Sequence, residues 1–437
     1  MGMRDISLSS VFRRTLRGMR DLLPDEAERL RFIEQNARNL AKLYGYREVI
    51  TPIMEHYELL AAKSGEEIRK RMYVFEDLGG RKVALRPEFT ASIARLVATK
   101  MANAPKPIRL FSTGTLYRYD EPQFGRYREF WQANYELFGS SKPEADAEII
   151  SLVSNFMEKI GISNYYFKIG HIRILRGILH QEGITEEQQN SIMQLLDKKQ
   201  WDTALRLIQE VGGSQKCLNT LKKLFEIRGK DLDAVIQEVR ETVKDYPEAL
   251  EAIKNLCEIL SLLEAGNIEV EIVLEAGFAR GLEYYTGMIF EVYVSEITLA
   301  LAGGGRYDRL IESFGGGMIP AVGAALGPDR LSLAMERQRT FSTSSEEERI
   351  LVIPVDSTMI RETFKISSLL RKEGFCTEIE TMGRSVSQAL SDAARRGITH
   401  AVIIGPRETK IGKVVLRDMR KGKQETVSLE EILKKIK

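Results

Sequence analysis

The sequence IRLFSTGTLYRYD at residues 108–120 and the sequence YREFWQANYELFG at residues 127–139 decide the fold. Both are rich in aromatic and β-branched residues, which favour strands. Only EPQFGR separates them, at 121–126, and its Pro122 and Gly125 are typical of turns. The pattern therefore predicts two long strands joined by a polar turn.

The second strand of this hairpin has two unlike faces, because successive side chains of a strand point to opposite sides. The face that can build a core comprises Trp131, Ala133, Tyr135 and Leu137. The other face comprises Phe130, Gln132, Asn134 and Glu136, flanked by Arg118, Arg126 and Arg128. A strand face wetted by solvent would also be polar, although Lys, Thr and Glu are more usual there. The pattern leaves a solvent-exposed face and a binding surface both open.

Arginines are the candidates for binding a nucleotide. The chain contains neither GxxxxGK[ST] nor GxGxxG between a strand and a helix, so side chains and not a loop of amides would hold the phosphates. A guanidinium group grips phosphate through two parallel hydrogen bonds and keeps its charge.

Three further segments carry candidate site residues. ARGLEYYTG at 279–287 places Arg280 beside two tyrosines, although it could be a simple hairpin turn. LALAGGGRYD at 299–308 ends a predicted strand in three glycines, which allow close approach to the backbone or form a flexible turn. GPDRL at 327–331 puts Pro328 at the first helical position and Arg330 in the first turn, where an anion is favoured. The alternative for Arg330 is an ordinary surface arginine.

Composition indicates a globular, cytoplasmic protein. A chain of 437 residues, 43% hydrophobic and 29% charged, allows roughly two to four domains. The three cysteines lie far apart without a CxxC pair, which favours a reducing compartment over a disulfide framework or a zinc site. No apolar run approaches the roughly 18 residues of a membrane span, and the N-terminus has no apolar segment of a secretory signal.

The order of patterns predicts several domains. A helical repeat of apolar residues spans roughly 25–44, and strand-like REVITPIMEH follows at 47–56. Residues from about 173 to 264 are helical and charged, which indicates an inserted helical module. A polar linker at 340–348 precedes alternating strands and helices at 349–437, typical of an α/β domain.

The domain at 349–437 has 18 Lys and Arg against 11 Asp and Glu. Its net charge is therefore +7, and the rest of the chain has a net charge of −5. This uneven distribution indicates a polyanionic partner.

These motifs together resemble the class II aminoacyl-tRNA synthetases, and among them the histidyl-tRNA synthetase family. The stretches that carry the resemblance are RGMRDLLP, LRPEFT, LYRYDEPQFGRYREFWQANYE, ARGLEYYTG, GGGRYD and AVGAALGPDRL. The resemblance implies an α+β fold: a class II catalytic domain with an antiparallel sheet at 1–339, interrupted by the helical insertion, and an anticodon-binding α/β domain at 349–437. It also implies ATP-dependent activation of L-histidine to histidyl-adenylate and transfer to tRNA(His), by a homodimer that uses ATP with Mg²⁺ and has no assigned protein metal site.

The resemblance also implies roles for individual residues. Those expected at ATP are Arg118 on the α-phosphate, Arg330 on the γ-phosphate, Phe130 on adenine, and Asp120, Arg126 and Arg128 around them. Those expected at histidine are Glu88, Thr90 and Gln132 on the amino group, Glu136 and Tyr285 on the imidazole, Tyr284, and Gly304 and Gly305 as the floor. Arg280 would contact both the carboxylate and the α-phosphate, so Arg118, Arg280 and Arg330 are the expected catalytic residues. Gln123 would meet the tRNA acceptor end.

The sequence leaves three alternatives open, and it departs from the residues usual in the family at three positions. The alternatives are a synthetase-like regulatory subunit of histidine biosynthesis, which would lack an anticodon domain, another class II synthetase, and a nucleic-acid-binding module with an inactive site. Glu121 and Phe124 stand where bacterial members carry basic residues, and Glu283 stands where Asp is common.

Overall fold

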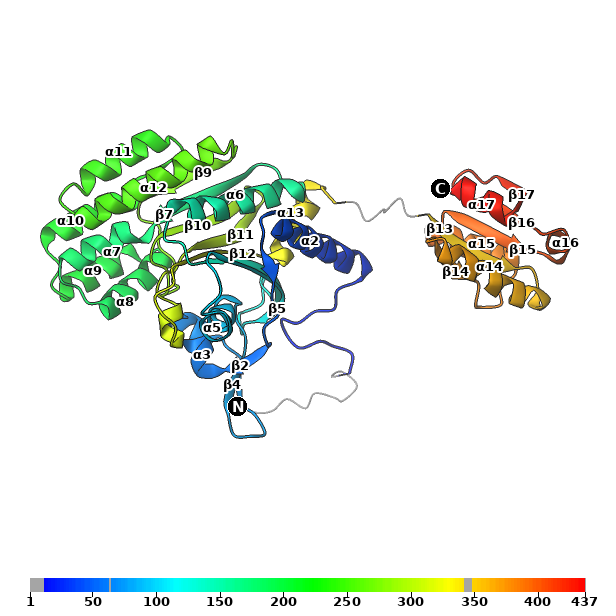
Figure 1. The fold of residues 1–437 in the computed structure, drawn as a ribbon, viewed down its shortest axis with the longest axis horizontal. Coiled ribbons are helices and arrows are strands. Elements are labelled where there is room, and N and C mark those ends of the chain that lie inside the picture. The colour runs from blue at the N-terminus through cyan, green and yellow to red at the C-terminus, as the bar shows by residue number, and fades with distance from the viewer. Residues whose placement is uncertain (1–11, 63, 342–347, 437) are drawn as a thin grey trace. The chain divides into compact units, whose positions relative to one another are not determined.

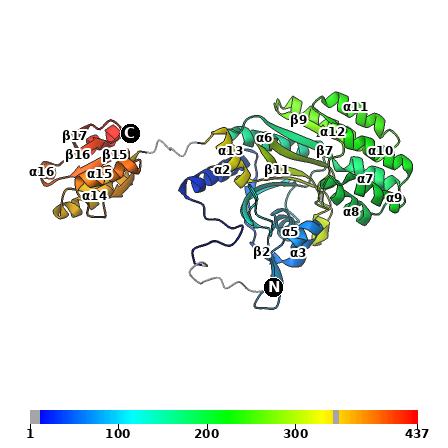
Figure 2. The same cartoon turned by 180° about the vertical axis from the view of Figure 1, so that it is seen from behind.

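The computed structural model describes residues 12–62, 64–341 and 348–436. The chain divides into two compact units, Met1–Phe341 and Ser342–Lys437, and Figures 1 and 2 show their elements from opposite sides. Within the described ranges, no helix is long and apolar enough to cross a membrane.

The first unit is built on a nine-stranded, mainly antiparallel sheet. Its strands, in spatial order, are β1 (Arg47–Glu48), β5 (Ile108–Tyr117), β6 (Glu129–Phe138), β12 (Ala321–Leu326), β11 (Ile297–Arg306), β10 (Met288–Val294), β7 (Tyr165–His171), β9 (Glu271–Glu275) and β8 (Arg228–Gly229). Only the β1–β5 and β7–β9 pairs are parallel. The expected α+β fold with an antiparallel catalytic sheet is confirmed.

The predicted hairpin is β5 and β6, paired in continuous register from Ile108 opposite Phe138 to Tyr117 opposite Glu129. The apolar face of β6 builds core as expected, with Ala133, Tyr135 and Leu137 fully buried. Tyr135 donates its hydroxyl hydrogen to the backbone oxygen of Ala37, so this face lies under helix α2 (Pro24–Leu43).

Three helices cover that face of the sheet: α2, α6 (Pro143–Lys159) and α13 (Pro328–Gln338), which lie side by side in Figures 1 and 2. Each begins with a proline in its first turn, where no backbone N–H is needed. The opposite face of the sheet carries the polar side chains of β6, and helix α5 (Thr90–Lys100) begins beside it.

The segment REVITPIMEH differs from its prediction as one strand. Pro52 lies between β1 and β2 (Met54–His56), which belong to different sheets, because a proline cannot donate a hydrogen bond in a ladder. Strand β2 joins β4 (Lys82–Leu85) and β3 (Val74–Glu76) in a small antiparallel sheet. The short helices α3 (Tyr57–Ala61) and α4 (Gly65–Lys70) follow β2.

The structure excludes two of the alternatives left open for loops. The glycines of GGGRYD form no flexible turn, because Gly303, Gly304 and Gly305 pair within β11 with both β10 and β12. The segment ARGLEYYTG is no hairpin turn, because β7 lies between β9 and β10, the strands that it connects. Helix η1 (Ile311–Phe314) follows the glycine strand.

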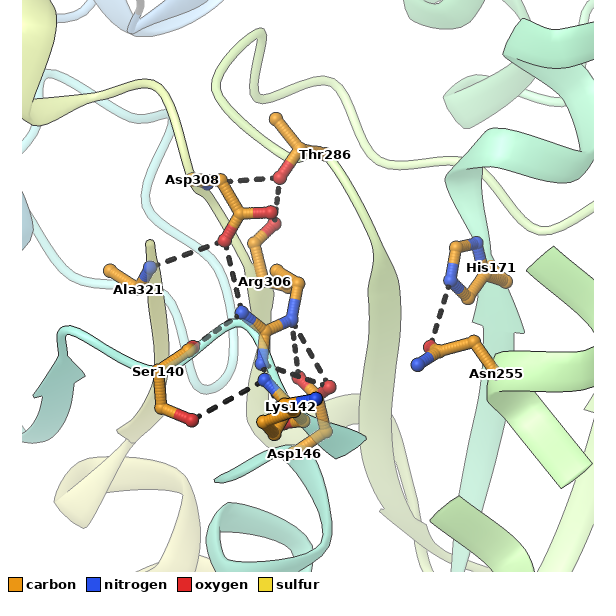
Figure 3. Close-up of polar contacts among 9 residues, drawn as sticks. All are labelled: Ser140, Lys142, Asp146, His171, Asn255, Thr286, Arg306, Asp308 and Ala321. Atoms are coloured by element: carbon orange, nitrogen blue, oxygen red, sulfur yellow. Dashed lines mark hydrogen bonds and ion pairs between the residues drawn. The ribbon is translucent and has the colours of Figure 1, made fainter. Parts of the chain in front are cut away.

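The helical insertion is present as predicted. It comprises α7 (Ile172–Gln181), α8 (Glu186–Asp197), α9 (Trp201–Glu210), α10 (Gln215–Glu226), α11 (Leu232–Thr242) and α12 (Pro247–Ala265). His171 anchors it to the sheet: its Nδ1 accepts from Arg173 N at 3.3 Å, and its Nε2 lies 3.2 Å from Asn255 Oδ1 of α12 (Figure 3). Burial lowers the pKa of His171 to about 3, so the imidazole is neutral and serves as a fixed hydrogen-bonding group.

The second unit is a five-stranded sheet flanked by helices. Its strands, in spatial order, are β14 (Cys376–Ile379), β13 (Arg349–Pro354), β15 (His400–Ile404), β16 (Lys413–Asp418) and β17 (Gln424–Ser428). Its helices are η2 (Ser357–Met359), α14 (Ile360–Lys372), α15 (Val386–Arg395), α16 (Pro406–Lys410) and α17 (Leu429–Ile436). The strand–helix alternation matches the prediction, and β17, α16 and α17 are additions to it. Most of the predicted linker lies outside the described residues.

Candidate active site

A pocket of about 420 Å³ opens on the polar face of β6. Thirteen of the residues singled out in the sequence line it: Glu88, Thr90, Arg118, Asp120, Arg126, Phe130, Gln132, Glu136, Arg280, Tyr284, Tyr285, Gly304 and Arg330. They come from β6, β11, the starts of α5 and α13, and the segments after β5 and β9. The solvent-exposed interpretation of the β6 face is therefore wrong: Asn134 and Glu136 are 2% and 1% exposed.

Three of the predicted residues lie away from the pocket wall. Gln123 is exposed in the β5–β6 connection, where it pairs with Arg126 through the backbone. Arg128 stacks on the ring of Tyr119 at 3.6 Å. Gly305 of β11 follows Gly304, which lines the pocket, but does not line it itself. A Cβ added to Gly305 would come 2.5 Å from Met288 O. Ligand contacts by these three, and by the thirteen residues that line the pocket, stay predictions.

One end of the pocket concentrates positive charge. Arg118, Arg126 and Arg330 line it, and none of them makes an ion pair with a described residue. Arg330 instead donates to two backbone oxygens, Ala300 O at 2.7 Å and Gly125 O at 3.3 Å. Burial, together with the charges of Arg126 and Arg118, lowers the pKa of Arg330 to about 10. Three crowded cations without an acidic partner form a site that favours a polyanion.

An aromatic ring lies beside this cationic end. The guanidinium carbon of Arg118 is 5.2 Å from the centre of the Phe130 ring, and its Nε donates to Pro87 O at 2.9 Å. Phe130 is thus held at the pocket wall with a face available for stacking on a planar ligand.

The other end of the pocket is built around the buried carboxylate of Glu136. Thr90 Oγ1 donates to its Oε1 at 2.7 Å and Asn134 Nδ2 at 3.2 Å, while the Tyr307 hydroxyl donates to its Oε2. Burial raises the pKa of Glu136 to about 7 in spite of these donors. The carboxyl group therefore titrates near neutral pH.

Gly323 of β12 makes room for this carboxylate. It pairs directly with Glu136 across the two strands, and a Cβ added to it would collide with Glu136 Oε2. Only a glycine at position 323 allows the Glu136 side chain to lie flat over strand β12.

Two other polar groups face the pocket near Glu136. The Tyr284 hydroxyl donates to Glu88 Oε2 at 3.3 Å, and burial raises the pKa of Glu88. Oε1 of Gln132 is buried and accepts no hydrogen bond from the described part of the chain. An unpaired buried acceptor suits a ligand that donates hydrogen bonds, such as an ammonium group.

Arg280 also lines the pocket. Its Nη1 donates to Phe290 O at 3.2 Å, and its Nη2 is 3.9 Å from Glu291 Oε1 of β10. Glu291 is also paired with Lys168 at 3.0 Å. The helical insertion reaches this point too, because Asp197 lines the pocket and its Oδ2 is 2.8 Å from where a Cβ of Gly281 would lie.

A buried ion pair fixes the end of β11 next to the pocket (Figure 3). Arg306 donates to Asp146 of α6 through Nε and Nη2, both at 3.0 Å, and to Asp308 at 3.0 Å. Thr286 Oγ1 accepts from Asp308 N at 2.9 Å, which attaches the end of ARGLEYYTG to the same network. Breaking a buried pair of this kind typically costs about 3–5 kcal/mol. The network therefore positions Tyr307, which follows Arg306 directly.

Sequence reasoning missed Tyr307, Glu291 and Asp197 as pocket residues. Tyr307 stands within the quoted motif GGGRYD, so the motif contained the signal. Glu291 and Asp197 carry no local signal, since each reaches the pocket only through the packing of β10 or of the insertion.

Comparisons with known proteins match both units of the chain. The family model "Histidyl-tRNA synthetase" matches residues 18–331, and the model "Anticodon binding domain" matches residues 349–437. The histidine–tRNA ligase of Methanocaldococcus jannaschii is 41% identical over 419 residues, covering 95% of this chain and 97% of that protein.

Two solved structures share the fold. The histidyl-tRNA synthetase of Nostoc sp. PCC 7120 has a TM-score of 0.78 at 22% identity, covering 97% of this chain and 98% of that one. A structure from Bacillus halodurans, described as an ATP phosphoribosyltransferase regulatory subunit/histidyl-tRNA synthetase, has a TM-score of 0.74 at 25% identity, covering 87% of this chain and 96% of that one. The family model and the Methanocaldococcus jannaschii protein each match most of this chain, and the chain therefore belongs to the histidyl-tRNA synthetase family.

Proposed function

We propose that this protein is a histidine–tRNA ligase, which activates L-histidine with ATP to histidyl-adenylate and transfers the histidyl group to tRNA(His). One observation carries the proposal: a cluster of arginines without ion pairs among the described residues and a buried, hydrogen-bonded carboxylate line one pocket, together with Arg280. Charging of a tRNA(His) transcript with labelled histidine tests it directly.

The first step joins two anions. A carboxylate oxygen of histidine attacks the α-phosphorus of ATP, the new P–O bond forms, and the bond to pyrophosphate breaks. Preorganised cations must neutralise the charge that develops on the phosphate oxygens. Arg118 and Arg280 would contact the α-phosphate and Arg330 the γ-phosphate, and none of them needs to transfer a proton.

Histidine would be selected by satisfying both imidazole nitrogens. A neutral imidazole has one donor and one acceptor. Glu136 would accept the N–H, and a tyrosine hydroxyl, from Tyr285 or from Tyr307 after it rotates away from Glu136, would donate to the other nitrogen. An amino acid without these groups would leave buried polar atoms unpaired, which costs much of its binding energy. Glu88, Thr90 and Gln132 would receive the amino group.

Magnesium enters this proposal as part of the substrate MgATP. Among the residues that the structure describes, no group of three or more His, Cys, Asp and Glu is arranged to hold a metal ion. The dispersed cysteines favour a cytoplasmic location for the reaction.

The regulatory-subunit alternative is not favoured. Such a subunit lacks an anticodon domain, whereas residues 349–437 match one, and the relative compared over most of this chain is a ligase. The arginines and Glu136 are also all present in the pocket.

The raised pKa of Glu136 gives a pH-dependence prediction. Below its folded pKa of about 7 the carboxyl group is protonated and no longer accepts the imidazole N–H, so kcat/KM for histidine should fall as the pH falls. A group with a pKa of about 7 goes from roughly half to roughly one tenth ionised between pH 7 and pH 6, so the expected loss is about fivefold. The Glu136→Gln variant should show only the titration of histidine itself. Equal pH profiles for the two proteins would contradict the assignment.

The second unit is proposed to read the tRNA. All residues assigned to ATP and histidine precede it, and its net charge of +7 suits a polyanion. A chain ending at Ser345, which lies outside the described residues, should still make histidyl-adenylate but charge tRNA poorly, through a raised KM for tRNA. Pyrophosphate exchange and aminoacylation on one preparation measure this, with the oligomeric state checked first. Equal retention of both activities would remove the assignment.

A homodimer is also proposed. The helix at 24–43 and the segment around Pro52 match the part that pairs across the twofold axis in class II enzymes. Large apolar side chains are exposed on and beside the small sheet: Ile50, Ile53, Met54, Val74, Phe75 and Leu78. A patch of this kind on one surface marks an interaction site.

Light scattering at micromolar concentration should give twice the 49.6 kDa chain mass. Ile50→Glu, at a side chain that is 91% exposed, should weaken the dimer, whereas Ile411→Glu in the second unit should not. A monomeric mass for the unaltered protein would overturn the proposal.

A further inference from the structure

The segment RGMR at residues 17–20 packs directly on the connection between β5 and β6. Arg128 N donates to Gly18 O at 2.8 Å, which adds the segment to the edge of that connection. Gly18 has a φ of +84°, and an added Cβ would come 2.7 Å from the Arg128 side chain, so glycine is needed for this approach. We call residues 17–20 the N-terminal strap.

Arg20 is the part of the strap that reaches inward. Its guanidinium forms an ion pair with Asp329 and stacks on the Tyr127 ring at 3.6 Å. The Asp329 side chain is only 4% exposed, and its other oxygen accepts from Trp131 N at 2.7 Å. One buried carboxylate thus joins the strap, the strand β6 and the first turn of α13.

These contacts converge on the nucleotide end of the pocket. Each partner adjoins a proposed ATP contact: Asp329 adjoins Arg330, Trp131 adjoins Phe130, and Tyr127 adjoins Arg126. Arg20 itself does not line the pocket, whereas Asp329 does. Any effect of Arg20 on a ligand must therefore pass through these neighbours.

We propose that Arg20 is a positioning residue for ATP, which holds Arg330, Phe130 and Arg126 in their binding arrangement through Asp329 and Tyr127. This inference rests on the proposed function, since it takes the ligand at that end to be ATP. Two physical effects combine. Without Arg20 the stacking that orients Tyr127 is lost, and the negative charge of Asp329 is left uncompensated beside Arg330, where it competes with a phosphate.

The test is equilibrium binding of MgATP and, separately, of L-histidine to the full-length protein by titration calorimetry. Arg20→Ala should weaken MgATP binding about tenfold or more, because small displacements of binding groups have effects of this size. Asp329→Asn should weaken it less, because it disturbs the same contacts but leaves no negative charge to compete with a phosphate. Histidine binding should change less than twofold. The double variant should bind MgATP no more weakly than the more impaired of the two single variants, because the two residues act as one pair.

A matched control lies on the same strap. Arg17 pairs with Glu121 at 2.7 Å, but both side chains are more than 70% exposed, so Arg17→Ala should leave both affinities unchanged. Arg20→Lys keeps the charge without the planar stacking group and should restore part of the MgATP affinity. If Arg20→Ala does not fold, the comparison of Arg20→Lys with the unaltered protein decides the question.

The outcomes separate the two proposals. Unchanged MgATP binding in Arg20→Ala, or an equal loss of MgATP and histidine binding with a lowered Tm, overturns the positioning role. If the unaltered protein binds MgATP but not histidine, the proposed function fails while the inference about Arg20 is still decided by the MgATP arm. If it binds no MgATP, both proposals fail.

Discussion

Replacing Glu136 with alanine is expected to reduce histidine-dependent pyrophosphate exchange by about 10³-fold or more, because a site built to hydrogen-bond a substrate group discriminates by such factors. The carboxylate is 1% exposed and accepts the hydroxyl hydrogens of Thr90 and Tyr307, which hold it in one position for the imidazole. MgATP binding should persist, because the arginines lie at the other end of the pocket. Exchange kinetics and titration with MgATP measure the two effects.

The control for this variant comes from the same strand. Glu129 of β6 bonds to the Tyr117 hydroxyl at 2.9 Å and does not line the pocket, so Glu129→Ala should keep near-normal exchange. The alanine at 136 leaves buried donors unpaired, at about 1–3 kcal/mol each, so thermal unfolding must accompany the kinetics. A folded Glu136→Ala protein that activates histidine normally would show that the amino-acid pocket has been placed on the wrong residues.

Replacing Arg280 with histidine is expected to slow adenylate formation by about 10²- to 10³-fold, the usual effect of losing one preorganised oxyanion donor. The guanidinium lines the pocket, held by Phe290 O at 3.2 Å and close to Glu291, which fixes it before the substrates arrive. Its contribution should therefore appear mainly in the transition state, and histidine affinity should change little.

Single-turnover kinetics separate the chemical step from binding. Arg309→His, at an arginine whose side chain is 63% exposed, is the matched control and should leave the rate unchanged. An unchanged chemical step in Arg280→His would remove the assignment. A rate loss accompanied by an equal loss of histidine affinity would make Arg280 a ground-state binding residue only.

Much of the fold could be predicted because its signals are local. The period of two along β6 sorted Tyr135 to the core and Glu136 to the opposite face, and the structure places them so. Helix α13 was predicted from Pro328 at its first position, and the strand–helix order of residues 349–404 from simple alternation.

Most of what the sequence could not predict depends on contact between distant segments. Glycines are poor strand formers, so a flexible turn stayed open for GGGRYD, yet Gly303, Gly304 and Gly305 lie within β11, where an added Cβ would meet Arg280 Nη1, Gly323 O and Met288 O in turn. Pro52 divides the predicted strand for a local reason, since it cannot donate a hydrogen bond in a ladder. Tyr307 and Glu136 are 171 residues apart, and Arg20 and Asp329 are 309 apart, so no local pattern could pair them.

The role of each site residue could be predicted only through the resemblance. The residues themselves indicated arginines for phosphate and a polar face of uncertain purpose. The structure adds the geometry: arginines without ion pairs among the described residues, a buried carboxylate of raised pKa, and a buried, unpaired oxygen on Gln132, all lining one pocket. These are the features that tie the pocket to a polyanion and to a ligand rich in hydrogen-bond donors.

The central claim is that this pocket activates histidine and no other amino acid. The most direct measurement is ATP–pyrophosphate exchange by the full-length protein with each of the twenty amino acids in turn. We expect exchange with L-histidine alone. Exchange with a different amino acid, or with none while MgATP binds, would contradict the account.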